Sequence, residues 1–162
     1  MIIQSFAPIA APDAEILILG SMPGVASLEA NQYYAHPRNA FWRIMGELYG
    51  AGLELPYDVR QSVLKSRRIA VWDVLQFCKR DGSLDSNIKE EVPNDFAQFF
   101  AAHPHVRRVG LNGGKAAKSF EKYARPYLPT SAIALPLPST SPAYAAKRFE
   151  QKCAEWQAAL RG

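Results

Sequence analysis

Short aliphatic runs alternate along this chain with longer segments in which apolar residues recur at helical spacing. The aliphatic runs are short enough to be buried strands, and they cover residues 15–20, 69–74, 106–111 and 131–137. Helical patterns occupy the intervals and the end of the chain, at 39–48, 58–65, 115–123 and 143–160. This alternation predicts a three-layer α/β/α sandwich around a mainly parallel sheet of about four strands.

Start and stop signals refine these elements. Gly50 follows the helix predicted over 39–48, as expected for a residue just beyond a helix end. Asn94 is the expected N-cap of a further helix that carries Phe96, Phe99 and Phe100. The segment 79–87 is polar and rich in turn formers, which predicts a loop.

Length and composition favour one globular unit. The 162 residues, of which 48% are hydrophobic, suit a single domain over residues 1–162, and no repeat or linker interrupts them. No stretch approaches 18 apolar residues and the first residues do not read as a signal peptide, which predicts no membrane association. We therefore expect a cytoplasmic protein, associated with the nucleoid if the source is bacterial, and a monomer.

The two cysteines carry little chemistry. Cys78 and Cys153 lie far apart and form no CxxC pair, which argues against a zinc ribbon or an iron–sulfur cluster. A single disulfide is one alternative, but a reduced, intracellular chain is the simpler interpretation. His103 and His105 flank Pro104 without a third ligand at useful spacing, so we interpret them as an exposed turn and predict no metal site.

The segments that follow the predicted strands are rich in Gly, Pro, Ser and Asn. They are Gly20–Gly24, the residues from Asp73 onward, Asn112–Lys115 and Pro138–Pro142. Parallel α/β sheets bind ligands at the carboxyl ends of their strands, so these loops are expected to converge on one site. Asn112–Lys115 is not a nucleotide-triphosphate loop, because Val109 occupies the position of its first glycine.

The segment Tyr33–Trp42 is the most informative. It places an aromatic pair, a His-Pro turn and Asn39 at a helix start within ten residues. Asn39 is either an ordinary helix cap or a carboxamide directed into a pocket. Phe41 and Trp42 are more often core than ligand contacts at such spacing.

Five ordered motifs together resemble the uracil-DNA glycosylase superfamily, and within it the hypoxanthine-DNA glycosylases. They are Gly20-Ser-Met-Pro-Gly24, Gln32-Tyr-Tyr-Ala-His-Pro-Arg-Asn39, Trp72-Asp-Val-Leu75, Gly82-Ser-Leu-Asp-Ser86 and Ser139-Thr-Ser-Pro-Ala143. The resemblance spans about residues 15–156. It implies a monofunctional enzyme that flips a deaminated base out of damaged DNA and hydrolyses its N-glycosidic bond without metal or cofactor. Hypoxanthine is the favoured base, with uracil and xanthine as further candidates. The net charge of +4 is compatible with a polyanionic partner.

The resemblance also implies a set of site residues. Asn39 is the expected catalytic residue, which positions water or hydrogen-bonds the departing base. Tyr34 is expected to stack on the base, while His36 and Asp73 have either a catalytic or a structural role. The remaining substrate contacts are expected from Gly20, Ser21, Met22, Pro23, Gly24 and Asn112.

DNA contacts are expected from the last loop and from nearby cations. The residues are Ser139, Thr140, Ser141, Pro142, Lys115, Lys147 and Arg148, although a solvated face would explain the three cations equally well. Two positions depart from the wider superfamily. Met22 stands where many relatives have Asp or Asn, and Tyr144 stands where relatives often have Asn. A thioether cannot take a proton or orient water well. The resemblance to the hypoxanthine-DNA glycosylases implies that Asn39 carries the chemistry instead.

Three alternatives remain at this stage. One is a mismatch-specific uracil or thymine glycosylase. Another is a catalytically silent nucleic-acid-binding module, to which Met22 points and against which Asn39 argues. The third is an enzyme acting on free nucleosides, which would not need a basic surface.

Overall fold

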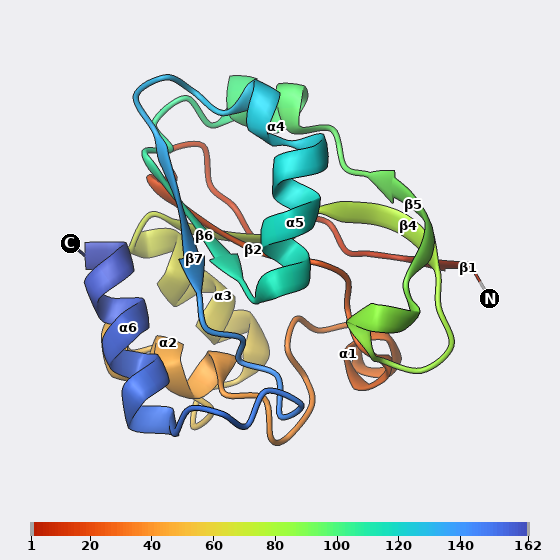
Figure 1. Ribbon diagram of the computed structural model, residues 1–162. Helices are drawn as coiled ribbons and strands as arrows, with labels where there is room; N and C mark the ends of the chain where they lie inside the picture. Colours follow the sequence, from red (N-terminus) through yellow and green to blue (C-terminus); the bar gives the residue numbers. More distant parts are fainter. Residues whose placement is uncertain (1, 162) are drawn as a thin grey trace.

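A four-stranded parallel sheet forms the centre of the protein. The computed structural model describes residues 2–161, and the strand order in the central sheet is β3–β2–β6–β7 (Figure 1). The strands are β2 (Ile16–Gly20), β3 (Ile69–Asp73), β6 (Arg108–Asn112) and β7 (Ile133–Leu137). Every neighbouring pair is parallel, which confirms the predicted sheet.

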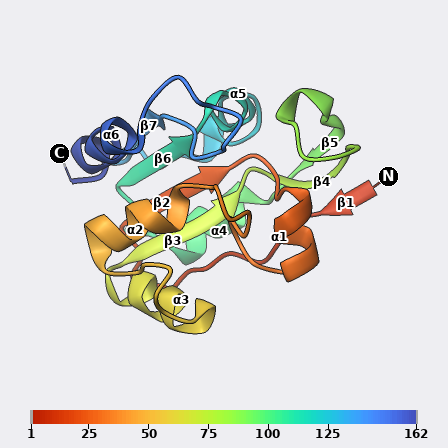
Figure 2. The same ribbon diagram turned by 90° about the horizontal axis from the view of Figure 1, so that it is seen from below.

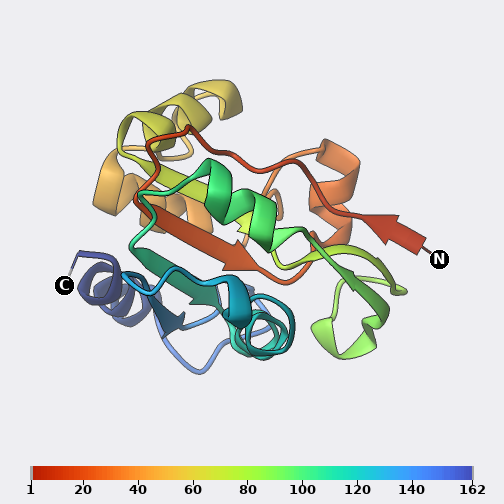
Figure 3. The same cartoon turned by 90° about the horizontal axis from the view of Figure 1, so that it is seen from above.

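Helices cover both faces of this sheet (Figures 1 and 3). One layer consists of α2 (Phe41–Tyr49), α3 (Tyr57–Ser66) and α6 (Phe149–Arg161). The opposite layer consists of α4 (Phe96–Ala102) and α5 (Gly114–Tyr123). Ile16 and Ile18 belong to the core under the first layer, and Leu17 and Leu19 to the core under the second. Successive strand residues point to opposite faces, so one aliphatic run supplies both cores and the three-layer sandwich is confirmed.

A second, antiparallel sheet lies beside the first and was not predicted. It has the order β1–β4–β5, from strands β1 (Ile2–Gln4), β4 (Leu75–Lys79) and β5 (Lys89–Pro93), and Figure 2 shows it at one side of the molecule. The predicted loop over 79–87 was therefore wrong at its start, because Lys79 belongs to β4; a short 3-10 helix, η1 (Asp85–Asn87), ends the segment. The sequence of β5, Lys-Glu-Glu-Val-Pro, has almost no apolar pattern, and the strand exists because β4 supplies its backbone partners.

Two predicted helix starts were wrong. Helix α4 is capped by Asp95, whose Oδ1 accepts a hydrogen bond from the backbone N–H of Gln98 at 3.0 Å. Asn94 instead donates through Nδ2 to the carbonyl oxygen of Asp73 at 2.8 Å, which joins it to the end of β3. Helix α6 begins at Phe149 rather than near residue 143. A six-residue helix, α1 (Val25–Ala30), follows the first loop and had no prediction.

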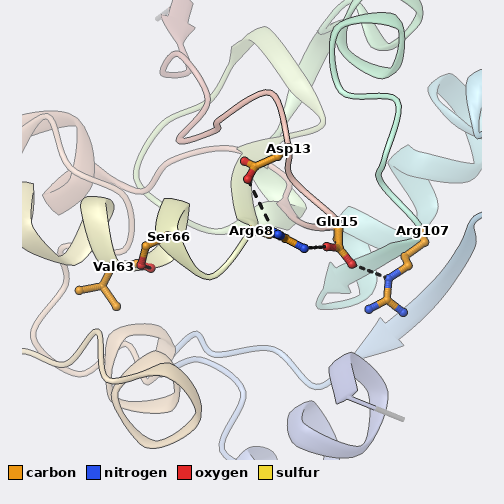
Figure 4. Close-up of polar contacts among 6 residues, drawn as sticks. All are labelled: Asp13, Glu15, Val63, Ser66, Arg68 and Arg107. Carbon is orange, nitrogen blue, oxygen red and sulfur yellow. Dashed lines mark hydrogen bonds and ion pairs between the residues drawn. The ribbon is translucent and has the colours of Figure 1, made fainter.

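The amino ends of the central strands are joined by ion pairs. The Glu15 carboxylate lies 2.7 Å from Nη1 of Arg68 and 2.9 Å from Nε of Arg107, and Arg68 also approaches Asp13 (Figure 4). These residues precede β2, β3 and β6, so the network tethers three strand starts. Hydrogen bonds from the two arginines lower the pKa of Glu15. The opposite edge of the sheet, where the strands end, is left for the loops that carry the candidate site.

No helix within residues 2–161 combines the length and the apolar character needed to cross a membrane. Cys78 and Cys153 are both free thiols.

Candidate active site

A cavity of about 380 Å³ lies at the carboxyl ends of β2 and β3. Its walls come from the first loop and the start of α1, the turn before α2, the end of β3, the loop that contains η1, and the last loop before α6. Of the predicted site residues, the cavity brings together Ser21, Met22, Pro23, Gly24, Tyr34, His36, Asn39, Asp73, Ser141 and Pro142. Most of the loops expected to converge at this edge of the sheet therefore do so.

Some residues of the cavity wall were not predicted as site residues from the sequence. Val25–Ser27, Ser83–Ser86 and Tyr144 also line the cavity. The segment 82–86 was among the motifs that carry the family resemblance, and that was the available signal for it. No role could be assigned to it, because its place across from the first loop depends on the β4–β5 hairpin.

The turn before α2 fixes the orientation of two polar side chains. The N–H of Asn39 donates to the carbonyl oxygen of His36 at 2.9 Å, which closes the turn. Oδ1 of Asn39 accepts from the N–H of Phe41 at 2.9 Å, and Nδ1 of His36 accepts from the N–H of Arg38 at 3.1 Å. Backbone donors therefore occupy the acceptor atoms of both side chains. Nδ2 of Asn39, and Nε2 of a neutral His36, remain as N–H donors on residues that line the cavity.

The two sequence-based interpretations of Asn39 are thus combined in one side chain. The N-cap position of α2 is Ala40, and Asn39 lies one residue earlier. Its oxygen still binds the first N–H of the helix, as a helix-start residue does. The helix terminus sets the carboxamide orientation, so Asn39 lines the cavity with a defined donor.

Tyr34 forms an aromatic wall. Its ring stacks on Phe41 with 4.1 Å between centroids and 23° between planes, which covers one face of the ring. Its backbone has φ of 53°, a left-handed conformation that is costly for a tyrosine. Its hydroxyl oxygen is buried beside the Asn112 side chain without a well-aligned hydrogen bond in the described structure. Burial raises the pKa of this hydroxyl, and Asn112 opposes the rise.

Asp73 ends β3 and is 3% exposed. Burial is the main cause that raises the pKa of its carboxyl group to about 7, with the nearby Asp85 carboxylate adding to the rise and Arg80 opposing it. Its Oδ2 is buried without a hydrogen-bond partner in the described structure. Asp73 and Tyr34 meet over Gly20, where an added Cβ would lie 2.6 Å from Oδ1 of Asp73 and 2.8 Å from the Tyr34 hydroxyl. Only glycine leaves both groups this space.

A buried arginine joins two of the loops. Arg80 is 4% exposed and donates from Nη2 to the carbonyl oxygen of Pro23 and from Nε to that of Gly82, each at 2.6 Å. The Ser21 hydroxyl also donates to Oδ1 of Asp85 at 2.7 Å. These contacts hold the first loop and the η1 loop together as one wall.

Asn112 and Thr140, expected to contact the base and the DNA, are instead paired with each other. Nδ2 of Asn112 donates to the Thr140 hydroxyl and Oδ1 accepts from the Thr140 N–H, both at 3.0 Å. Thr140 is 1% exposed, and its carbonyl oxygen accepts from the N–H of Ala40. Burial removes Thr140 as a direct phosphate contact, and the carboxamide of Asn112 is already paired. The pair ties the last loop to β6 and to the turn before α2.

The expected DNA-contacting side chains are also divided. Lys115 forms an ion pair with Glu91 and lies in a separate hollow with Lys118 and Lys122, so it is not placed at the cavity. Lys147 pairs with Glu155, whereas the exposed Arg148 directly precedes α6.

The remaining polar groups show no metal-binding arrangement. The Ser139 hydroxyl accepts from the N–H of Ser141, which shapes the last loop. Within residues 2–161, no group of three or more His, Cys, Asp or Glu side chains is positioned to hold a metal ion. The His103 ring stacks on Phe99.

Comparisons with known proteins agree with this architecture. The Uracil DNA glycosylase superfamily matches residues 7–161. A hypoxanthine DNA glycosylase of Methanosarcina barkeri is 40% identical over 116 residues, which cover 71% of this chain and 73% of the relative. A hypoxanthine DNA glycosylase of Methanosarcina acetivorans is 37% identical over 163 residues, which cover 99% of each chain.

A solved structure shares the fold. The solution NMR structure of a Methanosarcina acetivorans protein, described as a candidate uracil DNA glycosylase, superimposes with a TM-score of 0.84 at 36% identity. The match covers 99% of this chain and 98% of that one. The superfamily match over nearly the whole sequence, together with relatives well above 30% identity, shows that this chain belongs to the uracil DNA glycosylase superfamily.

Proposed function

We propose that this protein is a monofunctional DNA glycosylase that removes deaminated bases from damaged DNA, with hypoxanthine preferred. The carrying observation is the Asn39 carboxamide, which lines the cavity with its oxygen bound to the N–H of Phe41 and its Nδ2 available as a donor. The names of two similar Methanosarcina proteins support the preference for hypoxanthine. A volume of about 380 Å³ lies in the range of small-molecule sites and suits one extruded base.

The polar groups of the cavity suit this chemistry. Cleavage of the N-glycosidic bond leaves negative charge on the departing base and positive charge on the sugar. Nδ2 of Asn39 donates a hydrogen bond to the base as that charge develops, while the free face of Tyr34 stacks on the extruded ring. A neutral carboxamide cannot act as a general base, so its contribution is orientation and charge stabilisation.

The absence of lysine among the described cavity-lining residues favours a monofunctional reaction. A glycosylase with lyase activity needs an amine that forms a Schiff base with the sugar. Water is therefore the proposed nucleophile, and the products are the free base and an abasic site.

The first experiment measures base release. Labelled duplexes that carry one hypoxanthine, uracil or xanthine are incubated with the protein and then treated with alkali. Strand scission at the lesion only after alkali is the expected result, with hypoxanthine cut fastest. Scission at uracil alone would favour the mismatch-specific alternative, and no scission on any duplex would favour the silent binding module.

The Asn39→Ala variant tests the proposed site. Single-turnover excision should slow about 10²–10³-fold, as for the loss of one preorganised donor, while duplex binding measured by fluorescence anisotropy changes little. The matched control is Gln98→Ala, which removes an exposed carboxamide from α4 on the opposite face of the sheet. An Asn39→Ala rate within about threefold of wild type, a difference under about 1 kcal/mol, would overturn the assignment.

We further propose that the protein acts as a monomer in the cytoplasm. Light scattering at working concentration tests the first part, and fractionation of cells tests the second.

A further inference from the structure

A buried carboxyl group without a protein partner stands in the cavity wall. Asp73 is 3% exposed, it lines the cavity, and its Oδ2 has no hydrogen-bond partner in the described structure. Buried carboxylates are ordinarily paired or hydrogen-bonded, because an isolated buried charge is strongly unfavourable. The neighbouring Tyr34 hydroxyl is likewise buried, beside the side chain of Asn112. Asp73 therefore lines the cavity as a buried carboxyl group whose hydrogen-bonding capacity the surrounding protein does not satisfy.

The charged and titratable groups around Asp73 favour its neutral form. Asp85 faces it from η1 as a second carboxylate. The Tyr34 hydroxyl meets it over Gly20, whereas the Tyr33 hydroxyl donates to the carbonyl oxygen of Ala7. Arg80, which follows β4, is the opposing cation; its Nε and Nη2 donate to the carbonyl oxygens of Gly82 and Pro23, and its Nη1 is buried without a hydrogen-bond partner in the described structure. Burial, with a further contribution from Asp85 and against the charge of Arg80, raises the pKa of Asp73 to about 7, so a large fraction carries a proton at neutral pH.

A carboxylic acid in this place differs from the other donors of the cavity. Asn39 can hydrogen-bond a departing base, but its N–H protons are too weakly acidic to be transferred. Asp73 has both a transferable proton and an oxygen with no competing partner. Gly20 allows the Asp73 carboxyl group to pack closely against the end of β2, since a Cβ there would lie 2.6 Å from Oδ1.

We propose that Asp73, in its acid form, is the general acid that protonates the base as it leaves the sugar. This inference rests on the proposed glycosylase function and assigns a second catalytic residue to the same cavity. The bond from the anomeric carbon to the base nitrogen breaks and its electron pair stays with the base. The proton of the Asp73 carboxyl group passes to a nitrogen or oxygen atom of the base. The oxygen of a water molecule bonds to the anomeric carbon, and a proton lost from that water passes to solvent, from which Asp73 is protonated again.

The test is the pH dependence of single-turnover excision of hypoxanthine between about pH 5.5 and pH 9. The wild-type rate should be constant at low pH and fall about tenfold per pH unit above about pH 7, as Asp73 loses its proton. Asp73→Asn keeps the shape and a donor but has no transferable proton. It should lose about 10²-fold or more in rate and show no fall at high pH. A purely structural role would lower the rate without removing the pH dependence.

A second variant keeps the test independent of the folding of Asp73→Asn. Asp85→Asn removes the negative charge that raises the Asp73 pKa, so the alkaline fall in rate should move to lower pH by up to about one unit. A wild-type rate that is flat to pH 9, or an Asp73→Asn rate equal to wild type, would overturn the inference while leaving the proposed function intact. No base release by wild type at any pH would instead overturn the proposed function.

Discussion

At the scale of single residues, the cavity depends on groups that would be unfavourable elsewhere in a folded protein. Tyr34 has a left-handed backbone, and Asp73 is a buried carboxyl group without a partner. Strained backbones and buried ionisable groups without partners persist where contacts from the surrounding structure hold them in place. They are concentrated at functional sites. Both residues border the same cavity, which supports its identification as the site.

The raised pKa of Asp73 predicts a pH-dependent stability difference. The folded-state pKa of about 7 lies above the ordinary value of 3.8, so wild type loses stability as the pH rises from about 4 to 7. The side chain that replaces the carboxyl group in Asp73→Asn does not titrate. The free energy of unfolding of this variant should therefore rise relative to that of wild type over this pH range, by at most about 4 kcal/mol. Urea unfolding of both proteins at pH 5 and pH 8 measures the difference. An equal gap at both pH values would show that Asp73 is ionised throughout.

Substitution of Gly20 is expected to lower excision activity strongly while changing stability only modestly. Gly20→Ala places a Cβ against the tips of the Asp73 and Tyr34 side chains, which can move aside at a cost of about 1–2 kcal/mol. Their displacement should lower single-turnover excision at least about tenfold, since both line the cavity. The matched control is Gly114→Ala at the start of α5, where an added Cβ meets nothing within 4 Å. Equal excision by Gly20→Ala and the control would contradict this account of the wall.

At the scale of elements, loops from distant parts of the sequence are joined by polar side chains. Asn112 and Thr140 connect the end of β6 to the last loop, and the carbonyl oxygen of Thr140 accepts from the N–H of Ala40 at the start of α2. The indole of Trp156 in α6 donates to the carbonyl oxygen of Pro138. These contacts hold the last loop in an irregular path, which explains why α6 begins at Phe149, several residues later than its sequence pattern predicts.

Arg80 is the corresponding link on the other side of the cavity. Arg80→Met keeps much of the side-chain volume but leaves the carbonyl oxygens of Pro23 and Gly82 without their donor. The free energy of unfolding should therefore fall by about 1–3 kcal/mol. Excision should fall as well, because the two loops are no longer held as one wall. Chemical denaturation and single-turnover assays measure the two effects. Arg125→Met, which removes an exposed arginine paired with Glu121, is the control and should change neither.

At the scale of the whole molecule, the charges are less available to DNA than the net value of +4 implies. Several cations are already paired with carboxylates: Arg68 and Arg107 with Glu15, Lys115 with Glu91, and Lys147 with Glu155. The Glu15 network lies at the amino ends of the strands, away from the cavity. A phosphate contact near the cavity is therefore expected from an exposed cation such as Arg148, which follows the cavity-lining loop.

The salt dependence of duplex binding tests this view. Arg148→Ala should reduce the slope of log K against log salt concentration by about one, because one phosphate contact and its released counterion are lost. Lys115→Ala should leave the slope unchanged, since this side chain pairs with Glu91 in a separate hollow. Fluorescence anisotropy between about 50 and 200 mM salt measures both slopes. A larger effect for Lys115→Ala would place the DNA over α5 instead.

The parallel sheet and most of the cavity could be predicted from the sequence. Aliphatic runs such as Ile16–Leu19 specify buried strands through local hydrophobicity alone, and parallel strands must end at a common edge, so the loops after them converge. The motif that contains Asn39 lies in a short turn before α2, and its residues line the cavity together because such a turn constrains neighbouring residues within a few bonds.

Only the tertiary structure decided the rest. Three features depend on partners between 10 and 58 residues away in the chain, so no local sequence pattern predicts them: the polar strand β5, the wall formed by Ser83–Ser86, and the pairing of Asn112 with Thr140. The pairing of Lys115 with Glu91 and the raised pKa of Asp73 arise in the same way. Hydrophobic periodicity is a local property, so the sequence alone was enough to predict the elements that depend on it. Hydrogen-bond satisfaction and electrostatic environment depend on which groups meet in space, and only the folded chain brings those groups together.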